Sequence, residues 1–183
     1  MKMIIHFFLP QKPESLRAGF LPLLARVLFA SSLFLFFWRS AMTKFDGLFS
    51  LSVGAYVQIF PKTFEALGYD PAGLSFLHHL IAFAGSYGEV ILPLALVLGL
   101  MTRFSALGML GFIFVLSLVD IVGHGVKPGQ FFDGDPYGLI FDARLFWSFP
   151  LVVILAHGGG WLSVDSFLAR LPWVQKLKRN LST

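Results

Sequence analysis

Four long apolar runs constrain this chain more than any other feature of its sequence. They cover residues 20–38, 78–100, 104–122 and 139–156. A bilayer core of about 30 Å is crossed by roughly 20 helical residues, so each run can span it. Residues 101–103 alone separate the second run from the third, which must therefore return antiparallel beside it. The sequence predicts an all-α integral membrane protein, an antiparallel four-helix bundle.

Composition excludes a soluble domain and several kinds of chemistry. Hydrophobic residues make up 56% of the chain and charged residues 13%, against roughly a quarter charged in soluble domains. The chain has no cysteine, which excludes disulfide exchange and thiolate metal sites. The net charge of +4 comes largely from basic residues near the ends of the apolar runs. That placement fits membrane orientation better than binding to nucleic acid.

The apolar runs divide the chain into three parts. Residues 1–19 are a predicted cytoplasmic tail, residues 20–157 the membrane domain, and residues 158–183 a basic cytoplasmic tail. Glycine and proline punctuate residues 40–75, the longest stretch between runs, where we expect short interfacial helices. Residues 127–142 form a polar loop before the fourth run.

The basic residues also predict how the bundle is oriented, because lysine and arginine are enriched in cytoplasmic loops. One predicted side of the membrane has few acids and carries these basic residues: Lys2, Lys12, Arg17, Arg103, Arg170, Lys176, Lys178 and Arg179. On the other side, acids between positions 46 and 142 offset the basic residues. Both termini are therefore predicted to be cytoplasmic.

An acidic residue, Glu89, lies inside the second apolar run. A carboxylate in lipid is costly, and Pro93 cannot donate the helical hydrogen bond to the Glu89 carbonyl. By residue count, Arg26 of the first run is about 10 Å deep and Glu89 about 16 Å deep, an offset that an arginine side chain covers. We predict an intramembrane charge pair of Arg26 and Glu89. The pair would either fix helix register or place a protonatable carboxylate on a substrate or proton path.

Histidine and aspartate gather at the predicted outer face. His78 and His79 open the second run, Asp120 and His124 close the third, and further aspartates precede the fourth. These four residues are candidate ligands for Zn²⁺, Cu²⁺ or Mn²⁺, or for a proton shuttle. The alternative is that they are ordinary interfacial residues at helix ends.

Two further patterns concern packing. The aromatic residues Phe34, Phe36, Phe37 and Trp38 could stack a quinone ring, although lipid-facing phenylalanine is the commoner reason for such a run. Small residues in the second and third runs would let helix backbones approach closely. They are Ala82, Gly85, Ser86, Gly108 and Gly111.

Short motifs in a fixed order resemble the DoxX family of small four-span bacterial membrane proteins. They are Leu24–Leu28 with Arg26, Lys44-Phe45, Gly88-Glu89, Gly99–Arg103 and Gly159–Asp165. Together they extend over roughly residues 20–168. The resemblance implies that Arg26, Lys44, Glu89 and Arg103 are shared positions, without making any of them catalytic. The loops at residues 40–75 and 123–142 are longer here than in short members.

The resemblance also implies a function. The family takes its name from a subunit associated with thiosulfate:quinone oxidoreduction, and some members are linked to oxidative-stress responses. It therefore implies an accessory subunit of a redox or stress-related system in the bacterial inner membrane, with a membrane or periplasmic oxidoreductase as partner. The sequence favours a non-catalytic role, because it has no cysteine, haem-ligand pair or nucleotide motif. Quinone, a divalent metal and self-association are left open.

Two other function classes remain. A solute or metal-ion transporter would load its ion at the outer histidines and aspartates. It would also need polar residues at successive depths, and the membrane interior offers mainly Arg26, Glu89 and a few serine hydroxyls. An enzyme acting on lipid or quinone would have only Asp120 with His124 to activate water.

Overall fold

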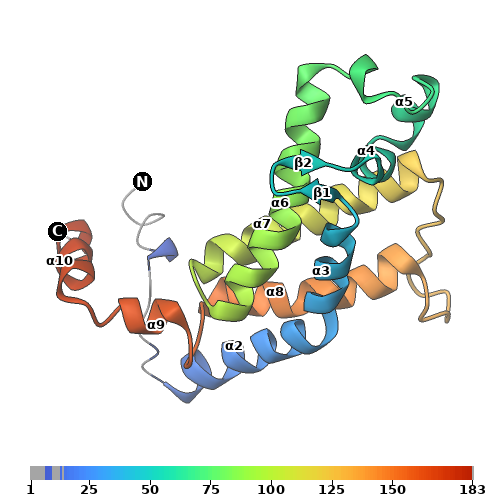
Figure 1. Cartoon of the computed structure of the whole chain (residues 1–183). Helices are drawn as coiled ribbons and strands as arrows, with labels where there is room; N and C mark the ends of the chain where they lie inside the picture. The colour runs from blue at the N-terminus through green and yellow to red at the C-terminus, as the bar shows by residue number, and fades with distance from the viewer. Residues whose placement is uncertain (1–6, 10–12, 14, 183) are drawn as a thin grey trace. The chain divides into compact units, whose positions relative to one another are not determined.

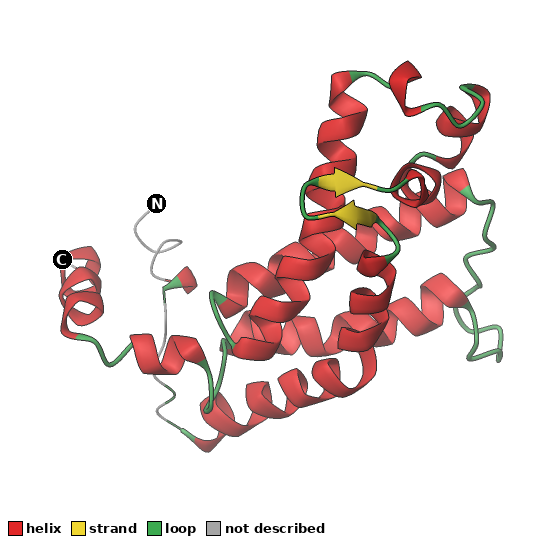
Figure 2. Cartoon of the chain, viewed as in Figure 1, coloured by secondary structure: helices red, strands yellow, loops and turns green. Residues whose placement is uncertain are grey.

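The computed structural model describes residues 7–9, 13 and 15–182. Helices make up most of this part of the chain (Figure 2). Four of them are long and apolar enough to cross a membrane: Leu16–Met42, Phe76–Leu98, Thr102–Gly123 and Leu139–His157. The predicted all-α, four-span membrane protein is confirmed. Lys2 and Lys12, which contributed to the orientation argument, lie outside the described residues.

The first span follows the ribbon labelled α2 and α3 in Figure 1 and consists of three consecutive helical pieces. They are α2 (Leu16–Phe29), the π-helical segment η1 (Ala30–Phe34) and α3 (Leu35–Met42). The Ser15 side chain begins α2 by accepting a hydrogen bond from the Ala18 amide. In η1, the hydroxyls of Ser31 and Ser32 both donate to the Leu28 carbonyl, at 3.1 and 2.6 Å. Such side-chain bonding to a preceding carbonyl competes with the α-helical pattern, which widens locally here.

The other spans contain two more π-helical segments. The second span is α6 (Phe76–Leu98), and the third is α7 (Thr102–Leu118) continued by η3 (Val119–Gly123). The fourth is η4 (Leu139–Arg144) continued by α8 (Leu145–His157). Two short helices follow it, α9 (Val164–Leu168) and α10 (Pro172–Ser182).

The long stretch between the first two spans contains the expected short helices. They are α4 (Val53–Ile59), α5 (Pro61–Ala66) and the 3-10 turn η2 (Pro71–Gly73). A two-stranded antiparallel hairpin, β1 (Phe45–Gly47) and β2 (Ser50–Leu51), precedes them and was not foreseen from the sequence. Tyr56, Phe64, Leu74 and Ala82 form a buried apolar cluster under this stretch.

The chain divides into two compact units. The first unit contains residues 1–34, 92–110 and 147–183, and the second contains residues 35–91 and 111–146. Fully buried apolar side chains fill each of them. In the first unit they include Phe29, Leu96, Met109, Leu151 and Ile154, and in the second Phe37, Ala41, Ala55, Phe64 and Ala82.

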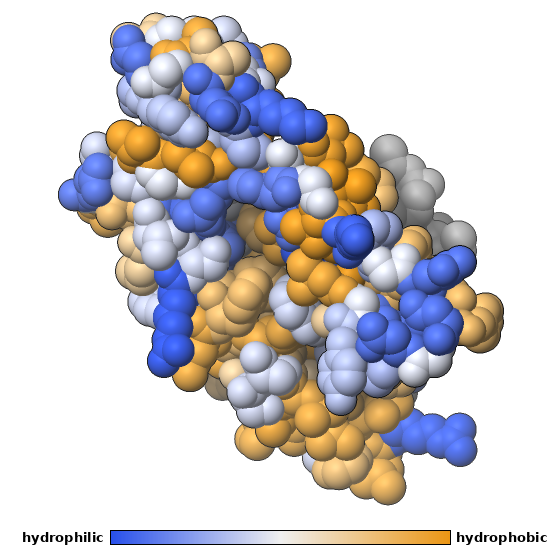
Figure 3. Space-filling view, turned by 90° about the vertical axis from the view of Figure 1, so that its right-hand side faces the viewer, coloured by the Kyte–Doolittle hydropathy of each residue, from blue (hydrophilic) through white to orange (hydrophobic). Residues whose placement is uncertain are grey.

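Large apolar side chains also cover much of the surface, as expected of a protein in lipid. Broad apolar areas alternate with hydrophilic groups on the face drawn in Figure 3. Phe146 is 71% exposed. In the aromatic run of the first span, Phe37 is fully buried, whereas Phe36 and Trp38 are exposed. Among the small residues, Gly108 lies against Leu92, whereas a Cβ at Gly111 would meet no described atom within 4 Å.

Candidate functional site

A buried ion pair of Lys44 and Glu89 lies in the second unit. The Lys44 Nζ is 2.6 Å from the Glu89 Oε2, and the two side chains are 7% and 3% exposed. Lys44 also donates to the carbonyl and hydroxyl oxygens of Ser40, at 3.3 and 2.9 Å. The ammonium thus has three oxygen partners, which compensates much of the cost of burying both charges.

The predicted pairing of Glu89 with Arg26 is therefore wrong. Lys44 follows α3, and its backbone is fixed by a bond from its amide to the Ala41 carbonyl and by one from the Ser52 amide to its own carbonyl. From that position its long stem reaches back to the level of Glu89. Residue counting gave the depth of each backbone and placed Lys44 outside the membrane. It did not allow for a lysine side chain directed inward.

Arg26, in the first unit, binds backbone carbonyls instead. Its Nε donates to the Leu96 carbonyl at 2.9 Å and its Nη2 to the Val97 carbonyl at 2.6 Å. Its Nη1 donates to the carbonyls of Gly159 and Leu162, at 2.9 and 3.1 Å. The last carbonyls of a helix have no helical donor and carry partial negative charge. The guanidinium therefore closes the C-terminal end of α6 and joins it to the segment that follows α8.

Asp165 accepts hydrogen bonds from the groups at the start of α7. Its Oδ1 accepts from the Met101 amide at 2.9 Å, and its Oδ2 accepts from the Thr102 amide and hydroxyl at 2.8 and 2.5 Å. The Asp165 amide donates to the Gly99 carbonyl at 2.9 Å. A carboxylate suits this place because the first amides of a helix lack acceptors and carry partial positive charge. The role of Asp165 was missed from the sequence, although it belongs to the last motif of the family resemblance.

Two glycines allow these groups to approach. Gly99 has φ +70°, and a Cβ there would lie 2.4 Å from the Ser163 Cβ and 2.8 Å from the Arg26 Cζ. A Cβ at Gly159 would lie within 2.8 Å of both Ser163 and the Thr102 hydroxyl. We call Arg26, Gly99, Thr102, Gly159 and Asp165 the Arg26–Asp165 lock. It connects the ends of the helices within the first unit.

Arg103, the remaining family-matched residue, is also bound to backbone. Its Nη2 donates to the Ala156 carbonyl at 2.9 Å and its Nη1 to the Phe7 carbonyl. The guanidinium lies over the Phe7 ring, 4.0 Å from the ring centre, a cation–π contact. Arg103 therefore connects the start of α7 to the end of α8 and to the N-terminal segment.

The predicted outer metal ligands each have a different partner. His78 hydrogen bonds with Ser75, and His124 with the Gln58 carbonyl. Asp120 forms an ion pair with Arg144, which links η3 to η4. In the described part of the chain, no group of three or more His, Cys, Asp or Glu side chains could hold a metal ion. The structure does not bring the four candidates together as a metal site.

His79 is bound to a tyrosine. Its Nδ1 is 2.8 Å from the Tyr56 hydroxyl, and the two rings meet edge to face. Burial raises the pKa of Tyr56 above its usual value, so the hydroxyl stays neutral and available for this hydrogen bond. Tyr56 itself belongs to the buried apolar cluster with Phe64, so the hydrogen bond connects His79 of α6 to the stretch between the first two spans.

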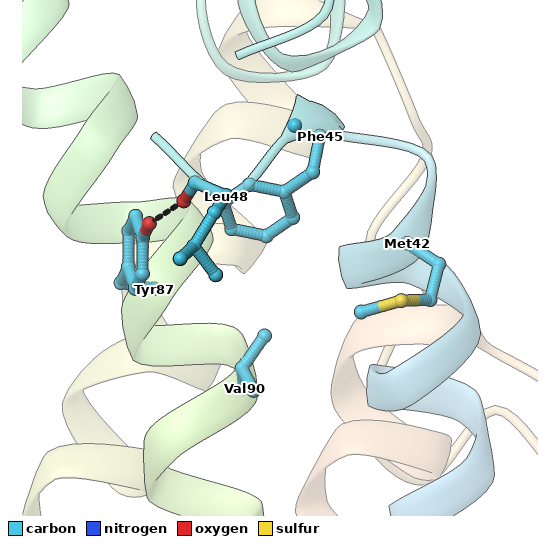
Figure 4. Close-up of a pocket in the computed structure, with 6 residues that line it drawn as sticks. Met42, Phe45, Leu48, Tyr87 and Val90 are labelled. Carbon is cyan, nitrogen blue, oxygen red and sulfur yellow. Dashed lines mark hydrogen bonds between the residues drawn. The ribbon is translucent and has the colours of Figure 1, made fainter. Parts of the chain in front are cut away.

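An apolar cavity of about 240 Å³ lies in the second unit (Figure 4). It is lined by Met42, Phe45, Gly47, Leu48, Tyr87 and Val90. The Phe45 and Tyr87 rings stand edge to face, 5.1 Å between centres, and the Tyr87 hydroxyl donates to the Leu48 carbonyl. Phe45 follows Lys44 in the chain and Val90 follows Glu89, so the residues of the ion pair adjoin two residues of the wall. The aromatic run at residues 34–38 does not line this cavity.

Comparison with protein families gives one finding. The DoxX family model matches residues 21–120, more than half of the chain. The matched region contains Arg26, Lys44, Glu89 and Arg103, whereas Asp165 lies beyond it. Comparisons with curated proteins and with solved structures found no match.

The ion pair can be tested by a double-mutant cycle. Lys44→Met and Glu89→Leu should each lower the free energy of unfolding by about 3–5 kcal/mol, because each leaves one buried charge without its partner. The double variant should recover much of that loss, since it buries no charge. Unfolding by heat or denaturant in detergent measures the free energy of unfolding of the two single variants and of the double variant. If Glu89→Leu instead couples with Arg26→Met and not with Lys44→Met, the assignment of partners is wrong.

Proposed function

The chain belongs to the DoxX family, and on that premise we propose that it is a non-catalytic, accessory subunit of a redox or stress-related system in the bacterial inner membrane. The observation that carries the proposal is how the shared charged residues are used. Arg26 and Arg103 bind backbone carbonyls, and Lys44 binds Glu89. These contacts hold helix ends and turns in place, which is the work of a scaffold. The chemistry would then come from a partner oxidoreductase.

We propose a quinone as the small molecule of such a system. The cavity beside Phe45 and Tyr87 offers aromatic and aliphatic walls that suit a flat ring with an apolar tail. Tyr87 is its one hydroxyl-bearing wall residue, and that hydroxyl already donates to Leu48. The walls therefore fit the ring by stacking and dispersion, and the partner would supply the redox-active group.

Metal or solute handling at the outer face has less support. His78, His79, Asp120 and His124 are each engaged by a separate partner. The serine hydroxyls of the first span donate to the Leu28 carbonyl, so they do not form steps of a polar path.

We also propose that both ends of the chain are cytoplasmic, from the positive-inside rule. The chain has no cysteine, so one introduced cysteine gives a single label site. In intact cells, a membrane-impermeant maleimide should label Asp133→Cys, in the loop before the fourth span. It should label Gln175→Cys, in α10, only after the membrane is permeabilised. The reverse pattern would contradict the orientation.

Purification from the native membrane tests the accessory role. The tagged chain in mild detergent should show, by native mass spectrometry, a second polypeptide in fixed ratio and an added quinone mass. The chain without its partner should not reduce or oxidise decylubiquinone. Val90→Trp should fill the cavity and remove the quinone mass while retaining the partner, and Ile91→Trp, on an exposed neighbouring position, is the matched control.

Two outcomes would contradict this proposal. A bare polypeptide, with neither partner nor quinone, would leave no support for a subunit. Quinone turnover by the isolated chain would make it an enzyme in its own right.

A further inference from the structure

Helix α10 has an apolar face that is only partly covered. Its Trp173, Val174 and Leu177 lie along one side of the helix, and Gln175 and Arg179 lie on the opposite side. Val174 is buried at 1% exposure, whereas Trp173 is 62% exposed and Leu177 42%. A helix with one apolar and one cationic face is the form that segments lying in a membrane interface take.

The charge of this segment favours an anionic partner. After Asp165 the sequence contains no acidic residue and four basic ones: Arg170, Lys176, Lys178 and Arg179. Clusters of lysine and arginine beside a membrane span are attracted to anionic lipid headgroups, and each contributes to binding. A cationic protein surface would be repelled by the same segment.

The lock holds the start of this segment at the ends of the spans. Arg26 donates to the carbonyls of Gly159 and Leu162, and the Trp161 amide donates to the Gly19 carbonyl at 3.0 Å. Asp165 is bound to the first residues of α7. The chain therefore leaves α8 at the same level as the ends of α2, α6 and α7 within the first unit, where α9 begins (Figure 1).

Exposed apolar side chains continue along this segment toward α10. Leu162 and Phe167 are well exposed, and Trp161 is partly so. Tryptophan is enriched at the level of lipid headgroups because its ring is apolar and its N–H is polar. A lipid surface offers acyl chains to the apolar side chains and phosphates to the cations. A soluble protein partner would need to match both along the same short stretch.

We propose that α10 is an interfacial helix that binds the anionic phospholipid surface of the bilayer that the chain spans. Trp173 and Leu177 enter the boundary between headgroups and acyl chains. Arg170 and Lys176 contact lipid phosphates. The site is distinct from the cavity at Phe45 and does not depend on the redox role proposed above.

Single-site labelling of the full chain tests this directly. Leu177→Cys places an environment-sensitive NBD label on the apolar face, and Gln175→Cys places it roughly 200° away around the helix as the matched control. Each protein is reconstituted into nanodiscs of phosphatidylcholine or of an equimolar mixture with phosphatidylglycerol. In the anionic discs the label at 177 should emit at shorter wavelength and resist quenching by iodide. The label at 175 should remain quenchable in both kinds of disc.

The cations are tested in the same assay. Adding Arg170→Gln and Lys176→Gln to the Leu177→Cys protein should shift the ratio of lipid-docked to free helix by about thirtyfold. High salt should shift it in the same direction. Protection at 177 that is equal in neutral and anionic discs would overturn the proposal, because anionic headgroups would then contribute nothing to covering this face. Protection seen only in native membranes would also overturn it, in favour of a protein partner.

Discussion

The guanidinium of Arg26 is the group on which the first unit depends. The carbonyls buried with Arg26 at the end of α6 have no water to bind, and each left without a donor would be costly. Arg26 satisfies four carbonyls with one side chain, at the end of α6 and in the glycine-containing segment after α8. At the start of α7, the Asp165 carboxylate accepts hydrogen bonds from the backbone amides that lack a helical acceptor. The tight turn between α6 and α7 is thus stabilised from both sides.

In the second unit, a buried polar group is compensated by an ion pair. Glu89 lies in an apolar helix, and Lys44 neutralises it from the turn after α3. The same lysine is tied through its backbone to Ala41 and to Ser52, so the hairpin and α3 share an anchor with α6. In both units, buried charge is used to fix turns and helix ends. That use is what the proposed role as a non-catalytic subunit requires.

Sequence reasoning identified what depends on hydropathy and length. The four spans and the short helices between the first two followed from apolar runs and from glycine and proline, because lipid leaves few alternatives to a helix. Polar partners were harder to predict, since they depend on side-chain reach. The position of Glu89 in an apolar run indicates that it needs a partner, but Lys44, which reaches it, lies in the stretch between the runs. The charge of Arg26 predicts a carboxylate partner, whereas its partners are backbone carbonyls, which no sequence pattern indicates.

The outer residues show the same limit. His78, His79, Asp120 and His124 share one end of the predicted spans, yet each finds a nearer partner in Ser75, Tyr56, Arg144 or Gln58. That these residues lie at the same depth in the membrane does not indicate which local hydrogen bonds each one forms. The hairpin at residues 45–51 and the π-helical segments were also unforeseen. Hydropathy does not indicate the turn of the hairpin or, in η1, the serine hydroxyls that bond to the Leu28 carbonyl.

Replacing Arg26 by lysine tests the central claim most directly. A lysine keeps the charge but cannot present the planar set of donors that four carbonyls require. Arg26→Lys should lower the free energy of unfolding in detergent by about 3 kcal/mol or more, while Arg17→Lys, at an exposed position of the same helix, should change it little. Folded Arg26→Lys protein should still bind the partner proposed above. Unchanged stability with loss of partner binding would contradict a structural role for Arg26.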